Sequence, residues 1–315
     1  MLTWRSLSCA RGRDYAGRMA AEPHIRAFFD EPTNTVSYLV WDAESRFGVA
    51  IDPVLDFDPA SGAVDDDSVG KLLKAAEDLG VTLEWVLETH IHADHLSGAP
   101  LIKARTGAKI AIGEHVREVQ NIFRPIFGAE DVKAEGGDFD RLLTDGEQLQ
   151  VGGLAIEVIH TPGHTPACVS YRIGGAVFVG DTLFMPDYGT ARTDFPGGCA
   201  RQLYRSIRRL LQLPPETRLF MCHDYKAPGR DRFAWETTVR EQRVANKHVH
   251  DGIGEDEFVA MRQERDKGLA TPRLLIPSIQ VNMRAGRFPP AEASGVRYLR
   301  IPVKLRDGVA ASDIG

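Results

Sequence analysis

Four side chains that can bind a metal occupy six consecutive positions in the segment His90-Ile-His92-Ala-Asp94-His95. They come directly after residues 83–89, a run rich in apolar and β-branched residues that predicts a strand. Polar groups crowded at the end of a buried strand need partners, and one cation can neutralise several of them at once. The cluster therefore predicts a sheet with a metal-binding edge, and any fold proposed for the chain has to build that edge.

Three further side chains that can bind a metal lie at or near the ends of strand-like segments. His164 is central in a loop that two prolines and a glycine stiffen, and rigid loops suit fixed ligands. His160, at the start of this loop, is expected to be structural. Asp181 and His223 each follow an apolar run. An isolated aspartate there would be a turn or cap residue, but a carboxylate that accompanies histidines is a suitable metal ligand.

In chain order these groups form the pattern H-x-H-x-D-H, then a histidine, an aspartate and a final histidine. The pattern resembles the metallo-β-lactamase superfamily over roughly residues 35 to 225. The resemblance implies an α/β (α+β) fold, a four-layer αββα sandwich that carries its metal at one edge. Residue chemistry alone would let all seven side chains bind metal.

Two segments narrow the resemblance to the persulfide dioxygenases, also called sulfur dioxygenases. They are Arg192-Thr-Asp-Phe195 and Val281-Asn-Met-Arg-Ala-Gly286, where Ala285 replaces a family cysteine whose role is not carried over. In these enzymes one Fe(II) per chain leaves positions open for dioxygen and a substrate sulfur. The implied iron ligands are His90, His164 and Asp181. The implied outer-sphere groups, which orient ligands or shuttle protons, are Asp94, His95, His223 and His92, the last also as an additional ligand.

The alternative is a zinc-dependent glutathione thioester hydrolase that resembles glyoxalase II and holds one or two Zn(II). The first zinc would take His90, His92, His164 and Asp181. The second would take Asp94, His95, His223 and the shared Asp181. Such a site generates hydroxide from bound water and polarises a thioester carbonyl. Glyoxalase II usually has Gly-Cys-Gly-Arg where this chain has Arg-Thr-Asp-Phe, so the hydrolase ranks second.

The resemblance implies glutathione persulfide, or a similar small thiol persulfide, and O2 as the substrates. Three residues are expected to contact the persulfide: Arg192, Tyr225 and Arg284. Arg192 has a structural alternative, since it could pair with Asp194. The inserted segment Met185-Pro-Asp-Tyr188 resembles a bacterial branch linked to sulfide detoxification. A homodimer is left open.

Composition excludes several other partners. The net charge of −6 offers no basic field for nucleic acid or an anionic membrane. No apolar run approaches the roughly 18 residues of a membrane span. The four cysteines are far apart, which indicates a reducing compartment, and Cys168, Cys199 and Cys222 are expected to be inert. The expected location is the bacterial cytoplasm, with the mitochondrial matrix as the alternative because four arginines lie within residues 1–20.

The chain is expected to divide into a flexible or misassigned extension (1–20), a catalytic domain (21–230) and a C-terminal helical extension (231–315) that completes or flanks the site. Helical periodicity predicts helices after Asp67, near 114–123 and at 200–212. Strands are expected at 35–41, 47–52, 108–112, 149–159, 168–173, 176–180 and 218–222. Prolines from Pro272 onward predict an irregular end. His115, His248 and His250 are expected to face solvent.

Overall fold

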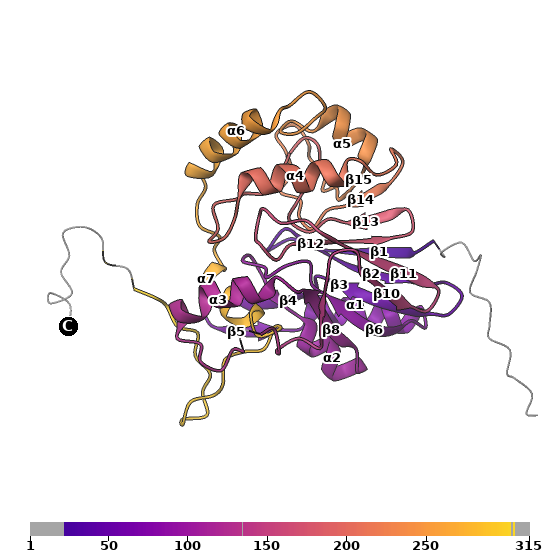
Figure 1. Cartoon of the computed structure of the whole chain (residues 1–315). Helices are drawn as coiled ribbons and strands as arrows, with labels where there is room; N and C mark the ends of the chain where they lie inside the picture. The colour runs from indigo at the N-terminus through magenta and orange to yellow at the C-terminus, as the bar shows by residue number, and fades with distance from the viewer. Residues whose placement is uncertain (1–21, 134, 304, 306–315) are drawn as a thin grey trace, which may run out of the picture.

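The computed structural model describes residues 22–133, 135–303 and 305. The expected extension at 1–20 lies outside these residues. Two six-stranded sheets lie face to face, and helices cover the outer face of each sheet (Figure 1). The predicted αββα sandwich is therefore confirmed.

The first sheet has the strand order β1-β2-β3-β6-β8-β9. Its strands are β1 (His24–Asp30), β2 (Thr35–Trp41), β3 (Phe47–Ile51), β6 (Thr82–Leu87), β8 (Lys109–Gly113) and β9 (Arg141–Leu143). The strands expected at 35–41 and 47–52 are present as β2 and β3, and they pair antiparallel, with Tyr38 opposite Ile51. Strands β3, β6, β8 and β9 are parallel to one another, so their carboxyl ends meet at one edge.

The second sheet has the order β10-β11-β12-β13-β14-β15. Its strands are β10 (Gln148–Val151), β11 (Leu154–His160), β12 (Val169–Ile173), β13 (Ala176–Phe178), β14 (Arg218–Phe220) and β15 (Glu236–Thr238). The strand expected at 149–159 is in fact a hairpin, because Gly152 turns the chain at a φ of 55°. Parallel pairing of β13 with β14 brings the segments that follow them, which carry Asp181 and His223, to the same edge.

Apolar side chains fill the space between the sheets and the space beneath each helical layer. Tyr38 and Ile51 face the second sheet, whereas Leu39 and Ala50 face helices, as the two-residue period of a strand requires. On the first sheet lie α1 (Asp67–Asp78), α2 (Ala99–Thr106) and α3 (Val116–Phe127). On the second lie α4 (Ala200–Leu210), α5 (Val239–Ala245) and α6 (Glu255–Lys267). The third sheet is small, with β5 (Ala63–Asp65), β4 (Val54–Asp58) and β7 (Leu96–Ser97).

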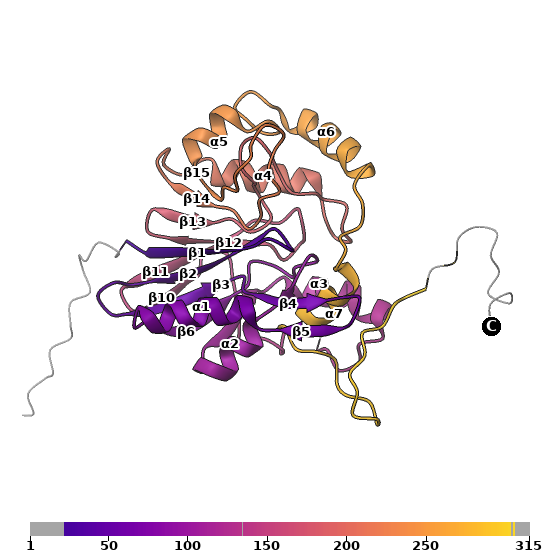
Figure 2. The same cartoon turned by 180° about the vertical axis from the view of Figure 1, so that it is seen from behind.

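The chain beyond residue 230 contributes to the sandwich. Strand β15 pairs with β14, and α5 and α6 complete the helical layer on the second sheet. The sandwich therefore extends past residue 230, where the catalytic domain was expected to end. From α6 the chain runs along one side of the molecule to α7 (Leu275–Asn282), which packs with the first sheet's helices (Figures 1 and 2). The irregular end expected after Pro272 is therefore wrong at α7, where Pro277 lies in the first turn and needs no intrahelical hydrogen bond.

Two further observations concern exposure. His248 was expected to face solvent, but it is 7% exposed, and its buried Nδ1 accepts a hydrogen bond from the Thr190 backbone N–H. In the part of the chain that the structure describes, we find no helix with the length and apolar character to cross a membrane.

Candidate metal centre

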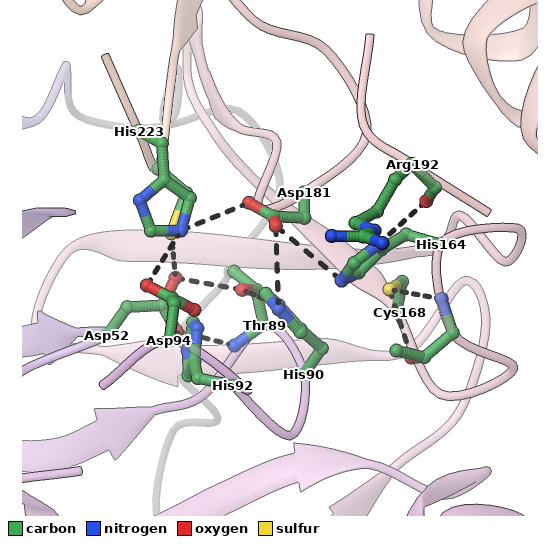
Figure 3. A network of polar contacts seen from close by, with 12 residues as sticks. Asp52, Thr89, His90, His92, Asp94, His164, Cys168, Asp181, Arg192 and His223 are labelled. Carbon is green, nitrogen blue, oxygen red and sulfur yellow. Dashed lines mark hydrogen bonds and ion pairs between the residues drawn. The ribbon is translucent and has the colours of Figure 1, made fainter. Parts of the chain in front are cut away.

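The seven sequence-predicted metal residues lie together where the two sheets meet. The backbone joins the sheets at this point, since the Val36 N–H donates to the Cys222 carbonyl and the Val169 N–H donates to the Thr89 carbonyl. Figure 3 shows Asp181 between His90 and His164 on one side and His223 on the other.

Asp181 is the central carboxylate of this group. One of its oxygens, Oδ2, lies 3.5 Å from His164 Nε2 and 4.0 Å from His90 Nε2. The other oxygen, Oδ1, lies 3.4 Å from His223 Nε2. A carboxylate that faces histidine nitrogens from both of its oxygens can bind one metal or bridge two.

Several of these buried polar atoms have no hydrogen-bond partner among the described residues. They are His90 Nε2, His92 Nδ1, His95 Nε2, His223 Nε2 and Asp181 Oδ1. A buried polar group without a partner costs roughly 1–3 kcal/mol, and five such groups in one place are not explained by packing. The donor set therefore fits a bound cation.

The opposite ring nitrogens of the histidines are held by hydrogen bonds. His164 Nδ1 donates to the Arg192 carbonyl at 2.8 Å, and His223 Nδ1 donates to the Asn34 carbonyl at 3.1 Å. His90 Nδ1 lies 3.0 Å from the Thr89 hydroxyl. Such contacts fix the tautomer of a metal-binding histidine and direct its free nitrogen toward the ion.

The donors include two groups that share no residue, each with its ligand atoms within 4.8 Å of one another. One contains His90, His164 and Asp181, and the other contains His92, Asp94 and His95. His223 lies between them, 3.3 Å from Asp94 Oδ2. The ligand division between one metal and two therefore stays a prediction.

Electrostatics keep the first histidine of the motif neutral. Burial lowers the pKa of His90 well below its ordinary value, and the neighbouring His92 and His164 lower it further. A neutral imidazole is the form that binds metal.

Tyr225, at 38% exposure, is also neutral, because burial of the hydroxyl and the nearby Asp94 and Asp181 raise its pKa.

Two positioning residues were missed by the sequence analysis. Asp52 follows β3 and lies 3.0 Å from His92 Nε2, and it also accepts the backbone N–H and the hydroxyl of Thr89. Asn282, at the end of α7, donates to the carbonyls of His92 and His95. Asp52 carries a usable signal, since it is an acid directly after an apolar strand. Asn282 lies in the segment Val281–Gly286 that resembles the persulfide dioxygenases, but nothing in that segment indicates a contact with His92, 190 residues away.

Three of the donors, Asp94, His164 and Asp181, line a cavity of about 340 Å³, a size that suits a small ligand. Tyr225 and Arg192 line the same cavity. Aromatic walls come from Phe184, Tyr188 and Phe195. The cavity therefore combines a polar metal end with an aromatic wall.

The three expected substrate residues differ in position. Arg192 lines the cavity, and it also forms the alternative ion pair with Asp194, with two contacts of 2.6 Å. Arg284 does not line this cavity. It is buried at the end of α7, where it contacts both oxygens of Asp131 at 2.7 Å. Arg284 therefore makes a structural contact with Asp131 and does not make the expected contact with the substrate.

The cysteines near the metal donors are buried thiols. Burial raises the pKa of Cys168 to about 12 and that of Cys222 well above its ordinary value. Cys199 is half-buried. Thiols with raised pKa values stay protonated at neutral pH and react slowly.

Residues 30–223 match the sequence profile described as Metallo-beta-lactamase superfamily. The chain belongs to the metallo-β-lactamase superfamily. The resemblance inferred from the motifs is thereby confirmed, and the seven donors occupy the sheet edge that it implied.

Curated members of this superfamily that are similar to the chain carry different names. The Probable metallo-hydrolase BURPS1710b_2304 of Burkholderia pseudomallei (strain 1710b) is 52% identical over 89% of this chain and 98% of its own length. Glyoxylase B2 of Dictyostelium discoideum is 44% identical over 90% of this chain and 98% of its own. The mitochondrial persulfide dioxygenase ETHE1 of Homo sapiens is 30% identical over 83% of this chain and 88% of its own length.

A solved superfamily member supports the same grouping. The crystal structure of ETHE1 from Myxococcus xanthus has a TM-score of 0.67 and 32% sequence identity, and the match covers 84% of this chain and 100% of that chain. Persulfide dioxygenases and proteins named as hydrolases or glyoxylases are therefore both relatives. The chain is a metallo-β-lactamase superfamily enzyme with a metal-binding cluster.

Proposed function

We propose that this chain is an Fe(II)-dependent persulfide dioxygenase that acts in sulfide detoxification. The proposed iron ligands are His90, His164 and Asp181. One observation carries the proposal: the segment Arg192-Thr-Asp-Phe195, which resembles the persulfide dioxygenases, contacts one of these ligands directly. The Arg192 carbonyl accepts from His164 Nδ1, and the ring of Phe195 lies edge-on to His164 with 5.1 Å between centroids.

The proposed reaction converts a low-molecular-weight persulfide, O2 and water into sulfite and the free thiol. The sulfane sulfur loses four electrons, and O2 accepts them. A ferrous ion at the triad supplies coordination positions for the persulfide sulfur and for O2. Glutathione persulfide is the proposed substrate.

The chain's own residues would position the substrate and limit water at the site. Tyr225 stacks on His223 with 5.5 Å between ring centroids, and Phe184 meets Tyr225 edge-on at 6.0 Å. These rings form an apolar wall beside Asp181. Outer-sphere roles are proposed for His92, Asp94, His95 and His223. The three histidines are buried, and each has a ring nitrogen without a hydrogen-bond partner among the described residues.

Oxygen uptake tests the proposal. The full chain is loaded anaerobically with Fe(II), mixed with glutathione persulfide, and followed with an oxygen electrode while sulfite is measured. We expect one sulfite per O2 consumed, and no uptake by protein loaded with zinc. An iron-loaded chain that takes up no oxygen would contradict the proposal.

The second candidate is a zinc-dependent glutathione thioester hydrolase. It is favoured by the additional donor group of His92, Asp94 and His95 and by the relatives named Probable metallo-hydrolase and Glyoxylase B2. It would bind up to two zinc ions and cleave S-lactoylglutathione without oxygen. Metal analysis of protein purified without added metal separates the two, since one iron per chain supports the dioxygenase and two zincs support the hydrolase.

Location and assembly are part of the proposal. We propose a bacterial cytoplasmic protein, with support from the bacterial relative above and from Cys168, Cys199 and Cys222, which are free thiols. A homodimer stays a prediction.

A further inference from the structure

Four arginines line the cavity that contains the metal donors. Two of them already have anionic partners. Arg192 pairs with Asp194 and donates to the Ala270 carbonyl, and Arg262 pairs with Asp266 at 2.7 Å. The contacts of these two arginines stabilise the wall of the cavity.

The other two, Arg265 and Arg273, have exposed side chains without any hydrogen bond or ion pair to the described residues. Arg265 lies in the last turn of α6, and Arg273 lies between α6 and α7. The chain between these helices runs along one side of the sandwich (Figure 2). Two free guanidinium groups therefore lie on the part of the cavity lining that the C-terminal segment supplies.

The acids of the cavity do not neutralise these groups. Its lining contains the carboxylates of Asp94 and Asp181, and both belong to the metal donors. Arg273 influences the exposed Asp58 outside this cavity but forms no ion pair with it. The two arginines are thus available to an anionic ligand.

The pKa shifts of neighbouring groups reflect an excess of positive charge beside α6. Burial lowers the pKa of His248 to about 3, and Arg262, Arg265 and Lys247 contribute to the shift. Burial and Arg265 also lower the pKa of Lys247, with Asp187 opposing them. A guanidinium group that is free in such a field binds carboxylates through paired N–H donors.

We propose that Arg265 and Arg273 bind the carboxylates of the substrate's thiol carrier, so that the chain selects a carboxylate-bearing carrier over a neutral one. The assignment rests on the proposed function for the reacting sulfur. Binding of the carrier does not depend on the oxidation step, and it can be measured separately.

The test is calorimetric titration of the full, metal-loaded chain with S-methylglutathione, which has both carboxylates but no sulfane sulfur. The variants are Arg265→Gln, Arg273→Gln and the double variant. The control is Arg240→Gln, an exposed arginine on α5 that does not line the cavity. We expect each cavity variant to bind at least about tenfold more weakly, with Arg240→Gln unchanged.

The diethyl ester of S-methylglutathione completes a thermodynamic cycle. If the arginines contact carboxylates, the ester binds the unmodified chain weakly and the double variant with the same affinity. Three results would overturn the assignment. The double variant could lose equal affinity for the acid and the ester, it could bind the acid with full affinity, or the unmodified chain could fail to bind the acid. If the binding results hold while iron-loaded protein consumes no oxygen, the carboxylate subsite stands and the dioxygenase proposal alone fails.

Discussion

Asp52 and His92 form a buried contact, in which the His92 Nε2–H donates to Asp52 Oδ1 at 3.0 Å. The other oxygen of Asp52 accepts the Thr89 hydroxyl at 2.8 Å, and that hydroxyl in turn lies 3.0 Å from His90 Nδ1. One carboxylate thus organises two histidines. It leaves Nδ1 of His92 and Nε2 of His90 without hydrogen-bond partners among the described residues, which suits both to a cation.

Replacing Asp52 with asparagine is expected to weaken metal binding by roughly 10–100-fold. Asparagine keeps the shape of the side chain and tolerates the left-handed backbone at this position, where φ is 47°. It lacks the charge that orients both histidines. Competition with a chromophoric chelator measures the affinity. The control is Asp58→Asn, at an exposed carboxylate, and equal affinity in the two variants would contradict the role of Asp52.

The sequence predicts the donors because each follows or closely adjoins an apolar strand, and this arrangement is visible within a few neighbouring residues. Contacts that join distant segments leave no such pattern. Asn282 supports the histidine loop from 190 residues away, and Arg265 and Arg273 look like ordinary surface arginines until α6 and α7 are placed beside the cavity. Pro277 misled the helix prediction because proline in a first helical turn and proline in a loop look alike in sequence.

Substitution of individual ligands is expected to separate one metal from two. His164→Gln should reduce iron from about one equivalent per chain to less than about a fifth, since it removes a triad ligand. His223→Gln should retain about one iron, since His223 is assigned an outer-sphere role. Elemental analysis of both variants after anaerobic loading is the measurement. If both lose metal to the same extent, His223 is a ligand and the single-iron assignment is wrong.

Arg284→Met is expected to reduce stability and to leave substrate binding unchanged. The Arg284 side chain is 6% exposed and pairs with Asp131, and it also donates to the Gln280 carbonyl. Loss of these charged hydrogen bonds should lower the free energy of unfolding by about 1–3 kcal/mol. Urea unfolding measures the loss, and calorimetric titration with S-methylglutathione measures binding. A large change in affinity without loss of stability would restore the substrate role expected from the sequence.

Alkylation should distinguish the cysteines of the native protein. Burial and the raised pKa values of Cys168 and Cys222 keep both thiols protonated and inaccessible at neutral pH. Among the three cysteines in the described part of the chain, iodoacetamide should therefore modify half-buried Cys199 first. Mass spectrometry of peptides from native and urea-unfolded protein gives the comparison. Modification of Cys222 at the rate of Cys199 in native protein would show that Cys222 is accessible and reactive.

Gly180→Ala is expected to damage the metal centre through the residue that holds His90. Gly180 has a φ of 51°, and an added Cβ would lie 2.7 Å from the Thr89 hydroxyl oxygen. Alanine costs about 1–2 kcal/mol in the left-handed region, and overpacking adds about 1–3 kcal/mol. Thr89 can relieve the contact only by moving, which breaks its hydrogen bonds to Asp52 and His90.

Gly80→Ala is the matched control, since Gly80 has a φ of 65° with nothing within 4 Å of the added Cβ. In urea unfolding of the metal-free protein, the free energy of unfolding of both variants should fall by the cost of alanine in the left-handed region. Gly180→Ala alone should lose the further packing contribution and show weaker metal binding by chelator competition. If the two variants bind metal equally well, the His90 orientation does not depend on Thr89, and the hydrogen bonds from Asp52 through Thr89 to His90 have no part in building the site.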